Sequence, residues 1–161
     1  HEMFGEILVD VFSTEMPMLL TVAIIVFLAL ETLNIMVLYF QPASRLGNGV
    51  GVFNAFERSK ADPEIHALVR YLVNWVAGTK LIFVALLIVI LATGTAATRA
   101  AAVAALILSI LSFFWRLYPS IVRMDRAGQV TPPGYSRTLG VMISCFVFGF
   151  AAVLLSFLAR G

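Results

Sequence analysis

Two charged residues lie inside long apolar stretches of this chain. Glu31 lies near the middle of residues 17–40, and Lys80 lies near the middle of residues 69–92. A central charge costs at least about 2.5–3.5 kcal/mol on membrane-insertion scales, so the two side chains are expected to pair. Asn34 follows Glu31 by one helical turn, on the same face, where its amide could hydrogen-bond the carboxylate. Glu31, Lys80 and Asn34 are therefore the candidate polar site within the membrane.

Two interpretations of this candidate site stay open at the level of the sequence. In the first, the three residues line a polar pathway or pocket in which the ionisable pair exchanges protons. In the second, the pair only fixes the register of two helices, because helical bundles also retain polar pairs for specificity. The sequence does not decide between them.

The composition places the chain among membrane proteins. It has 161 residues, of which 61% are hydrophobic and only 12% are charged. This balance lies far from that of a soluble domain. We expect one transmembrane domain over residues 1–161, since four spans of about 20 residues use nearly all of it. The net charge of +2 gives no reason to expect a nucleic-acid partner; membrane lipids are the expected surroundings.

The predicted fold class is an all-α membrane protein, a four-span helical bundle preceded by a short amphipathic surface helix. Residues 2–12 place apolar residues on one helical face and acidic residues on the opposite face, which is typical of a helix lying at the membrane surface. The best start signal is Asp62-Pro63-Glu64, which supplies a capping carboxylate and a proline at the first helical position. The predicted spans are residues 17–40, 63–93, 99–117 and 138–158.

The basic residues predict the orientation of these spans. Eight of them lie in or beside the two polar connections, residues 41–62 and 119–137, whereas the opposite side has only Arg99 and Arg160. By the positive-inside rule both connections are cytoplasmic and both termini extracytoplasmic, in a multi-pass plasma (inner) membrane protein. The eight are Arg45, Arg58, Lys60, Arg70, Arg116, Arg123, Arg126 and Arg137.

Four of these basic residues are also candidate contacts for anionic lipid. They are Arg116 at the cytoplasmic end of the third span, Arg123 and Arg126 beyond it, and Arg137 directly before the fourth span. The simpler interpretation is that Arg116 anchors the span and that the other three lie on a solvated loop. No metal site is predicted, since His66 has no second internal histidine to accompany it. The sequence predicts no cofactor and no catalytic residue.

Small residues recur along one face of each of the last two predicted spans. They are Ala102, Ala105, Ser109 and Ser112 in the third span and Cys145, Gly149, Ala152 and Ser156 in the fourth. Such faces are typical of helix–helix contacts in membranes. They serve either packing within the subunit or contacts in a homo-oligomer or larger membrane complex, and Cys145 is expected to have a packing role.

Three functions of different classes follow from these features. We favour a small channel or carrier that uses the Glu31–Lys80 site. The alternative is a non-catalytic accessory or assembly subunit of a larger membrane complex, in which the pair is structural. A small membrane enzyme acting on lipid comes third, because the sequence has no nucleophile–base pair, metal set or paired carboxylates, and enzymatic activity is not expected.

Overall fold

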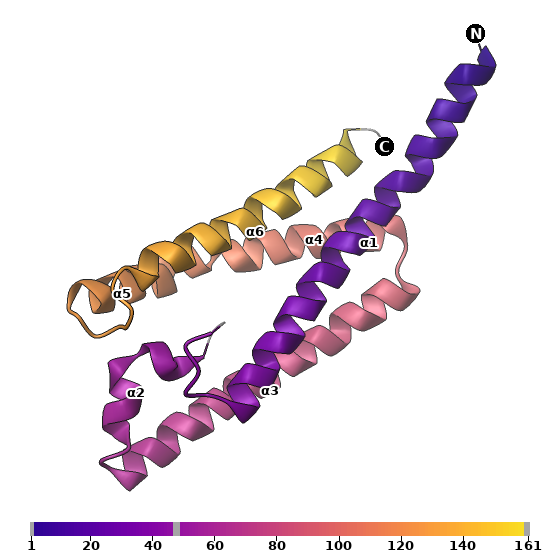
Figure 1. The fold of residues 1–161 in the computed structure, drawn as a ribbon. Helices are drawn as coiled ribbons and strands as arrows, with labels where there is room; N and C mark the ends of the chain where they lie inside the picture. Colours follow the sequence, from indigo (N-terminus) through magenta and orange to yellow (C-terminus); the bar gives the residue numbers. More distant parts are fainter. Residues whose placement is uncertain (1, 47–48, 160–161) are drawn as a thin grey trace.

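The chain forms a bundle of long helices (Figure 1). The computed structural model describes the backbone of residues 2–46 and 49–159, and the side chains within those ranges from residue 18 onward. In these residues the only β-structure is an isolated bridge between Phe53 and Val130. The elements are α1 (Glu2–Phe40), the 3-10 helix η1 (Val50–Val52), α2 (Asn54–Ser59), α3 (Pro63–Thr93), α4 (Ala96–Leu111), α5 (Phe113–Arg126) and α6 (Tyr135–Leu158).

Four stretches are long and apolar enough to cross a membrane. They are Met18–Phe40, Pro63–Thr93, Ala96–Arg126 and Tyr135–Leu158. The chain is therefore an all-α, multi-pass membrane protein, as its composition predicts. The predicted second span agrees with α3 at both ends, because Asp62 Oδ1 accepts hydrogen bonds from the backbone N–H groups of Glu64 and Ile65.

The first helix differs from the prediction. The predicted surface helix, residues 2–12, and the predicted first span belong to one continuous helix, α1. A proline within a long apolar helix removes one backbone hydrogen bond, which the rest of the helix tolerates, so Pro17 does not mark a helix start. The amphipathic face predicted for residues 2–12 depends on side chains outside the described residues. The first part of α1 extends beyond the other helices (Figure 1).

The third span was predicted to end too early. Helix continues through Tyr118 and Pro119 to Arg126, with a single interruption at Ser112 between α4 and α5. The predicted connection of residues 119–137 is therefore half helical, and α6 already begins at Tyr135. The physical reason is that α5 buries Ile121 against Val52 and Val130, and this tertiary contact outweighs the helix-breaking tendency of proline.

The core lies where α1, α3, α4 and α6 meet. Its centre is an aromatic cluster around Phe27 of α1, whose ring lies 5.9 Å from Phe83, 6.2 Å from Phe146 and 5.5 Å from Phe150, all edge-on. Edge-to-face pairs at such distances are the favourable aromatic geometry. α1 runs beside α3, and α4 runs beside α6 (Figure 1). The cluster thus joins three of the four spans.

The two polar connections meet at the same end of the bundle. Thr131 donates its backbone N–H to the carbonyl of Val52 over 2.8 Å, and its hydroxyl to Asn54 Oδ1 over 2.8 Å. Asn54 Nδ2 also donates to the carbonyl of Gly128 over 3.0 Å. These bonds across the chain fix both connections on one side, as an even number of spans requires.

Candidate functional site

The structure brings Glu31 and Lys80 together. Lys80 Nζ donates a hydrogen bond to Glu31 Oε2 over 2.6 Å, and the two groups form an ion pair. Glu31 belongs to α1 and Lys80 to α3, two helices held side by side by buried apolar residues on each. The buried residues of these two helices include Leu20, Ile24, Leu28, Ile35, Val73, Ala77, Val84 and Leu87. The apolar packing therefore sets the helix register that pairs the charges.

The ion pair is only partly enclosed. The Lys80 side chain is 25% exposed and the Glu31 side chain 19% exposed. Both side chains therefore reach the surface of the subunit, part-way along two membrane-spanning helices. Charge-assisted hydrogen bonds of this length are among the stronger ones in proteins. The pair thus combines a short hydrogen bond with partial exposure of both side chains.

Asn34 lies one turn from Glu31 on α1 and is half-buried. It is engaged in an interaction of its own, and its predicted hydrogen bond to Glu31 stays a prediction. Thr32 and Thr79, the closest hydroxyl residues along the two helices, both donate to backbone carbonyls in their own helices. Their hydroxyls are thus committed to the backbone of Leu28 and Trp75.

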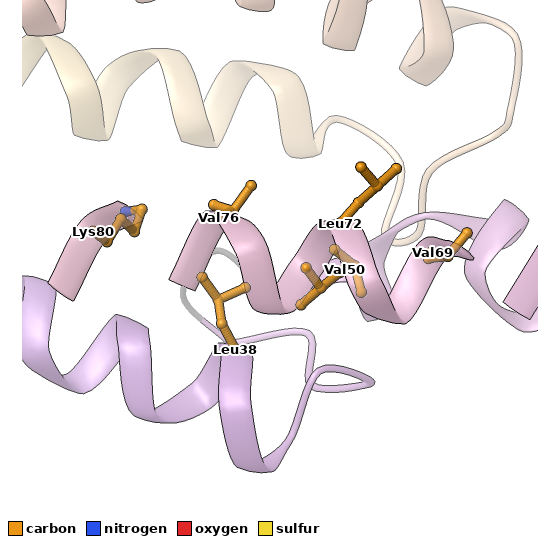
Figure 2. A pocket seen from close by; sticks show the side chains of 7 residues that line it. Leu38, Val50, Val69, Leu72, Val76 and Lys80 are labelled. Atoms are coloured by element: carbon orange, nitrogen blue, oxygen red, sulfur yellow. The ribbon is translucent and has the colours of Figure 1, made fainter. Parts of the chain in front are cut away.

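A groove leads to Lys80 along α3 (Figure 2). It has a volume of about 370 Å³ and is lined by apolar side chains, with Lys80 at one end. The other lining residues are Leu38, Val50, Val69, Leu72, Val73 and Val76, from α1, η1 and α3. The groove lies between the polar connections and Lys80, so the pair is approached from that side through an apolar passage.

On the other side of the pair, Arg99 ties three helices together. This residue is at the beginning of α4; its Nη1 donates to Thr21 Oγ1 of α1 over 2.9 Å, and its Nη2 donates to the carbonyl of Leu91 of α3 over 3.0 Å. Its Nε is buried without a hydrogen-bond partner. Sequence reasoning counted Arg99 only for orientation. Arg99 lies in the first turn of a span and is flanked by small residues, and this position is the signal that could have revealed its contacts with the other helices.

The four candidate lipid-binding arginines are exposed and do not form one cluster with the ion pair. Arg116 lies over the ring of Trp115, 5.5 Å from its centroid, and Arg123 Nη2 is 3.4 Å from Ser120 Oγ in the preceding turn of α5. Arg126 ends α5, and Arg137 lies in the first turn of α6. Their contact with anionic lipid stays a prediction.

Asp125 organises the connection between α5 and α6. Its carboxylate accepts hydrogen bonds from the backbone N–H of Gly134 at 3.0 Å, and from the N–H and hydroxyl of Ser136 at 2.9 and 2.6 Å. Asp125 thereby satisfies backbone donors at the start of α6, in the manner of a helix cap. Sequence reasoning gave it no such role.

His66 and Cys145 occupy ordinary structural positions. His66 Nδ1 lies 2.9 Å from Ser59 Oγ, and its ring lies against Phe56. Cys145 is exposed, so the packing role expected for it does not occur within this subunit. Among the residues whose side chains the structure describes, 18–46 and 49–159, no group of three His, Cys, Asp or Glu residues could hold a metal ion.

Most of the small residues predicted to form packing faces on the last two spans lie on the subunit surface, whereas Ala102 packs against the core. In α4 the buried residues are Ala100, Val103 and Leu106, whereas Ala105 and Ser109 are exposed. In α6 Phe150 is buried, and a methyl group added at Gly149 would meet nothing within 4 Å. The exposed small residues are therefore free to contact another helix outside the subunit.

Comparison with protein-family models, with curated proteins and with solved structures found no match to this chain. The chemistry of the candidate site is therefore argued from its own geometry.

Proposed function

We propose that this protein is a small membrane carrier whose working site is the Glu31–Lys80 pair. The observation that carries the proposal is the 2.6 Å contact between Lys80 Nζ and Glu31 Oε2, in side chains that keep 25% and 19% exposure. Ionisable residues within membrane spans are rare and usually mark ion or substrate pathways. A pair that is formed and still partly exposed at the subunit surface supports transport better than a fully enclosed structural pair would.

The proposed mechanism is exchange at Lys80. Protonation of Glu31 removes the negative charge that holds Lys80, so the ammonium group becomes available to an anionic group or to water. Deprotonation restores the ion pair and expels that ligand. One proton is taken up by the carboxylate and released again in each cycle, which couples movement of the ligand to movement of a proton.

The two sides of the pair support alternating access. Toward the polar connections, the groove along α3 reaches Lys80. On the opposite side, Arg99 holds α1, α3 and α4 together through Thr21 and Leu91. The described conformation would be the one open toward the connections. In this proposal the connections are cytoplasmic, the membrane is the plasma (inner) membrane and both termini are extracytoplasmic, following the positive-inside rule.

The test is proton movement in proteoliposomes. Purified protein is reconstituted with an internal pH-sensitive dye, an inward chloride gradient supplies an anion for Lys80, and equal potassium on both sides with valinomycin holds the membrane potential at zero. The wild-type protein should acidify the lumen faster than empty vesicles, because a proton enters with the anion, and Glu31→Gln should abolish the difference. Glu57→Gln is the matched control, because Glu57 forms an exposed ion pair with Lys60 at 2.7 Å outside the candidate site. Equal rates in wild type and Glu31→Gln would refute the proposal.

A second candidate function is favoured by the exposed small-residue faces of α4 and α6. Gly149, Ala152 and Ala105 lie on the surface, where a neighbouring helix could approach closely. The protein would then be an assembly subunit of a homo-oligomer or larger membrane complex. Solubilisation in a mild detergent, followed by mass measurement of the intact particle, separates the two: a constant larger membrane partner together with absent proton flux favours assembly.

A further inference from the structure

A second hollow continues the groove beyond its end at Val69. It has a volume of about 420 Å³ and shares Val50 and Val69 with the groove that reaches Lys80. Its other lining residues come from η1, α2 and the beginning of α3: Phe53, Ala55, Phe56, Arg58, Ser59, Asp62 and Ile65. The two hollows thus adjoin at Val50 and Val69, and together they extend from the polar connection at α2 to Lys80; we call them the furrow.

The furrow has an apolar part and a polar part. Between Val69 and Lys80 its walls are apolar, and the Lys80 stem adds methylene groups at the deep end. Between Arg58 and Ile65 they include charged and hydroxyl side chains. The rise along α3 from Val69 to Lys80 is about 16 Å at 1.5 Å per residue. This length is close to half of the roughly 30 Å hydrocarbon thickness of a bilayer, or one leaflet.

The polar end has an available cation. Arg58 is exposed and forms no ion pair with any other residue that the structure describes, whereas the neighbouring Lys60 is paired with Glu57 at 2.7 Å. Asp62, the acidic residue of the same hollow, uses Oδ1 to accept from the N–H groups of Glu64 and Ile65. Arg58 is therefore the group that can bind a phosphate, for which the guanidinium geometry is well suited.

We propose that this furrow binds one phospholipid, with an acyl chain between Val69 and Lys80 and the phosphate at Arg58. We favour a phospholipid over a protein helix because the furrow combines an apolar stretch with a cation, Arg58, at its polar end, which matches an acyl chain and a phosphate. The phosphate is common to anionic and zwitterionic phospholipids. The furrow exists whether or not the ion pair exchanges protons. With the acyl chain bound the groove is closed, so a ligand of the proposed carrier reaches Lys80 from this side only when the acyl chain has left.

The first test is lipid retention. Protein extracted in mild detergent is exchanged into fresh detergent, and bound phospholipid is counted by mass spectrometry of the intact complex. Wild type should retain one phospholipid per chain. Leu72→Trp, which fills the furrow, should reduce retention at least about five-fold, and Ile82→Trp should not. Ile82 is the matched control: it is 65% exposed on α3 and does not line the furrow. Equal retention in the two variants overturns the proposal.

The charge of the head group is tested with the same assay. Arg58→Gln should weaken retention several-fold, and Arg137→Gln, an exposed arginine of α6 outside the furrow, should leave it unchanged. Delipidated protein is then offered phosphatidylglycerol or phosphatidylethanolamine vesicles. Rebinding of both, with equal loss in Arg58→Gln, supports recognition through the phosphate. Rebinding that is unaffected by Arg58→Gln overturns the assignment of the phosphate.

A photochemical measurement on wild-type protein covers the case in which Leu72→Trp does not fold. A phospholipid with a diazirine at the end of its acyl chain is incorporated into the vesicles and illuminated. Cross-links should concentrate on residues 69–80 of α3 and compete with unlabelled phospholipid. Cross-links spread evenly over all lipid-facing helices would overturn the proposal.

Discussion

Lys80 and Glu31 are 49 positions apart in the chain, yet Lys80 Nζ and Glu31 Oε2 lie 2.6 Å apart between α3 and α1. Each side chain supplies the opposite charge that the other needs in apolar surroundings. The register of α1 against α3, set by buried Ile24, Leu28, Val84 and Leu87, makes this contact.

The two charges should be energetically coupled. Glu31→Gln and Lys80→Met should each destabilise the protein, and the double variant should lose less than the sum of both, by about 0.5–3 kcal/mol. The reason is that each single variant leaves one charge without its partner in apolar surroundings. Thermal unfolding in detergent measures all four proteins. Strict additivity would show that the pair contributes no coupling.

Loss of Arg99 should loosen the end of the bundle where α1, α3 and α4 meet. Arg99→Met removes the bonds to Thr21 and to the Leu91 carbonyl, at a cost of about 1–3 kcal/mol. Arg99→Lys should recover only part, because one ammonium group does not replace the planar fork of donors. Unfolding temperatures of both variants, beside Arg137→Gln as the control, decide the point. If Arg99→Lys restored the full unfolding temperature, simultaneous bonding of the guanidinium to α1 and α3 would not be what stabilises this end of the bundle.

Replacing Asp125 should open the connection between α5 and α6. Asp125→Ala removes the acceptor of three hydrogen bonds from Gly134 and Ser136. The amides of residues 134–137 should then exchange with deuterium several-fold faster, while those in the middle of α6 stay protected. Glu64→Gln, in the exposed first turn of α3, serves as the comparison. Unchanged exchange would mean that the connection is held by other contacts.

Two glycines of α6 should respond differently to alanine. A Cβ at Gly140 would lie 2.7 Å from Cε2 of Tyr118, so the tyrosine must move; a Cβ at Gly149 meets nothing within 4 Å. Gly140→Ala should destabilise by about 1–3 kcal/mol through overpacking. Gly149→Ala should be neutral or stabilise by up to about 1 kcal/mol through helix propensity. Thermal unfolding in detergent tests both variants. If Gly149→Ala destabilised an oligomer but not the isolated subunit, Gly149 would lie at a contact between subunits.

The proposed orientation can be checked by labelling. With Cys145 replaced by serine, Ala127→Cys, between α5 and α6, should be protected from an impermeant maleimide added to intact cells, and Thr95→Cys, before α4, should react. Ala127 and Thr95 are both exposed in the subunit, and Ala127 lies outside the furrow, so the difference in labelling reports the side of the membrane. The reverse pattern would place the connections outside and contradict the positive-inside assignment.

Sequence by itself determined the membrane class, the number of spans and the partners in the ion pair. Apolar length does not depend on tertiary contacts, and an isolated charge in hydrocarbon is costly enough to select its partner. Asp62-Pro63 likewise marks the start of α3 through local bonds alone. These features were predictable because each follows either from a single segment of the chain or from one large free-energy cost, that of an unpaired charge in hydrocarbon.

Tertiary structure decided the features that depend on weak local preferences and on neighbours distant in the chain. Pro119 lies inside α5 because Ile121 packs on Val52 and Val130, and the small residues of α6 face outward because Phe150 packs on Phe27. Only the packed helices place apolar residues of η1, α1 and α3 around the approach to Lys80. A groove is made by side chains that meet in space, so no single stretch of sequence contains it.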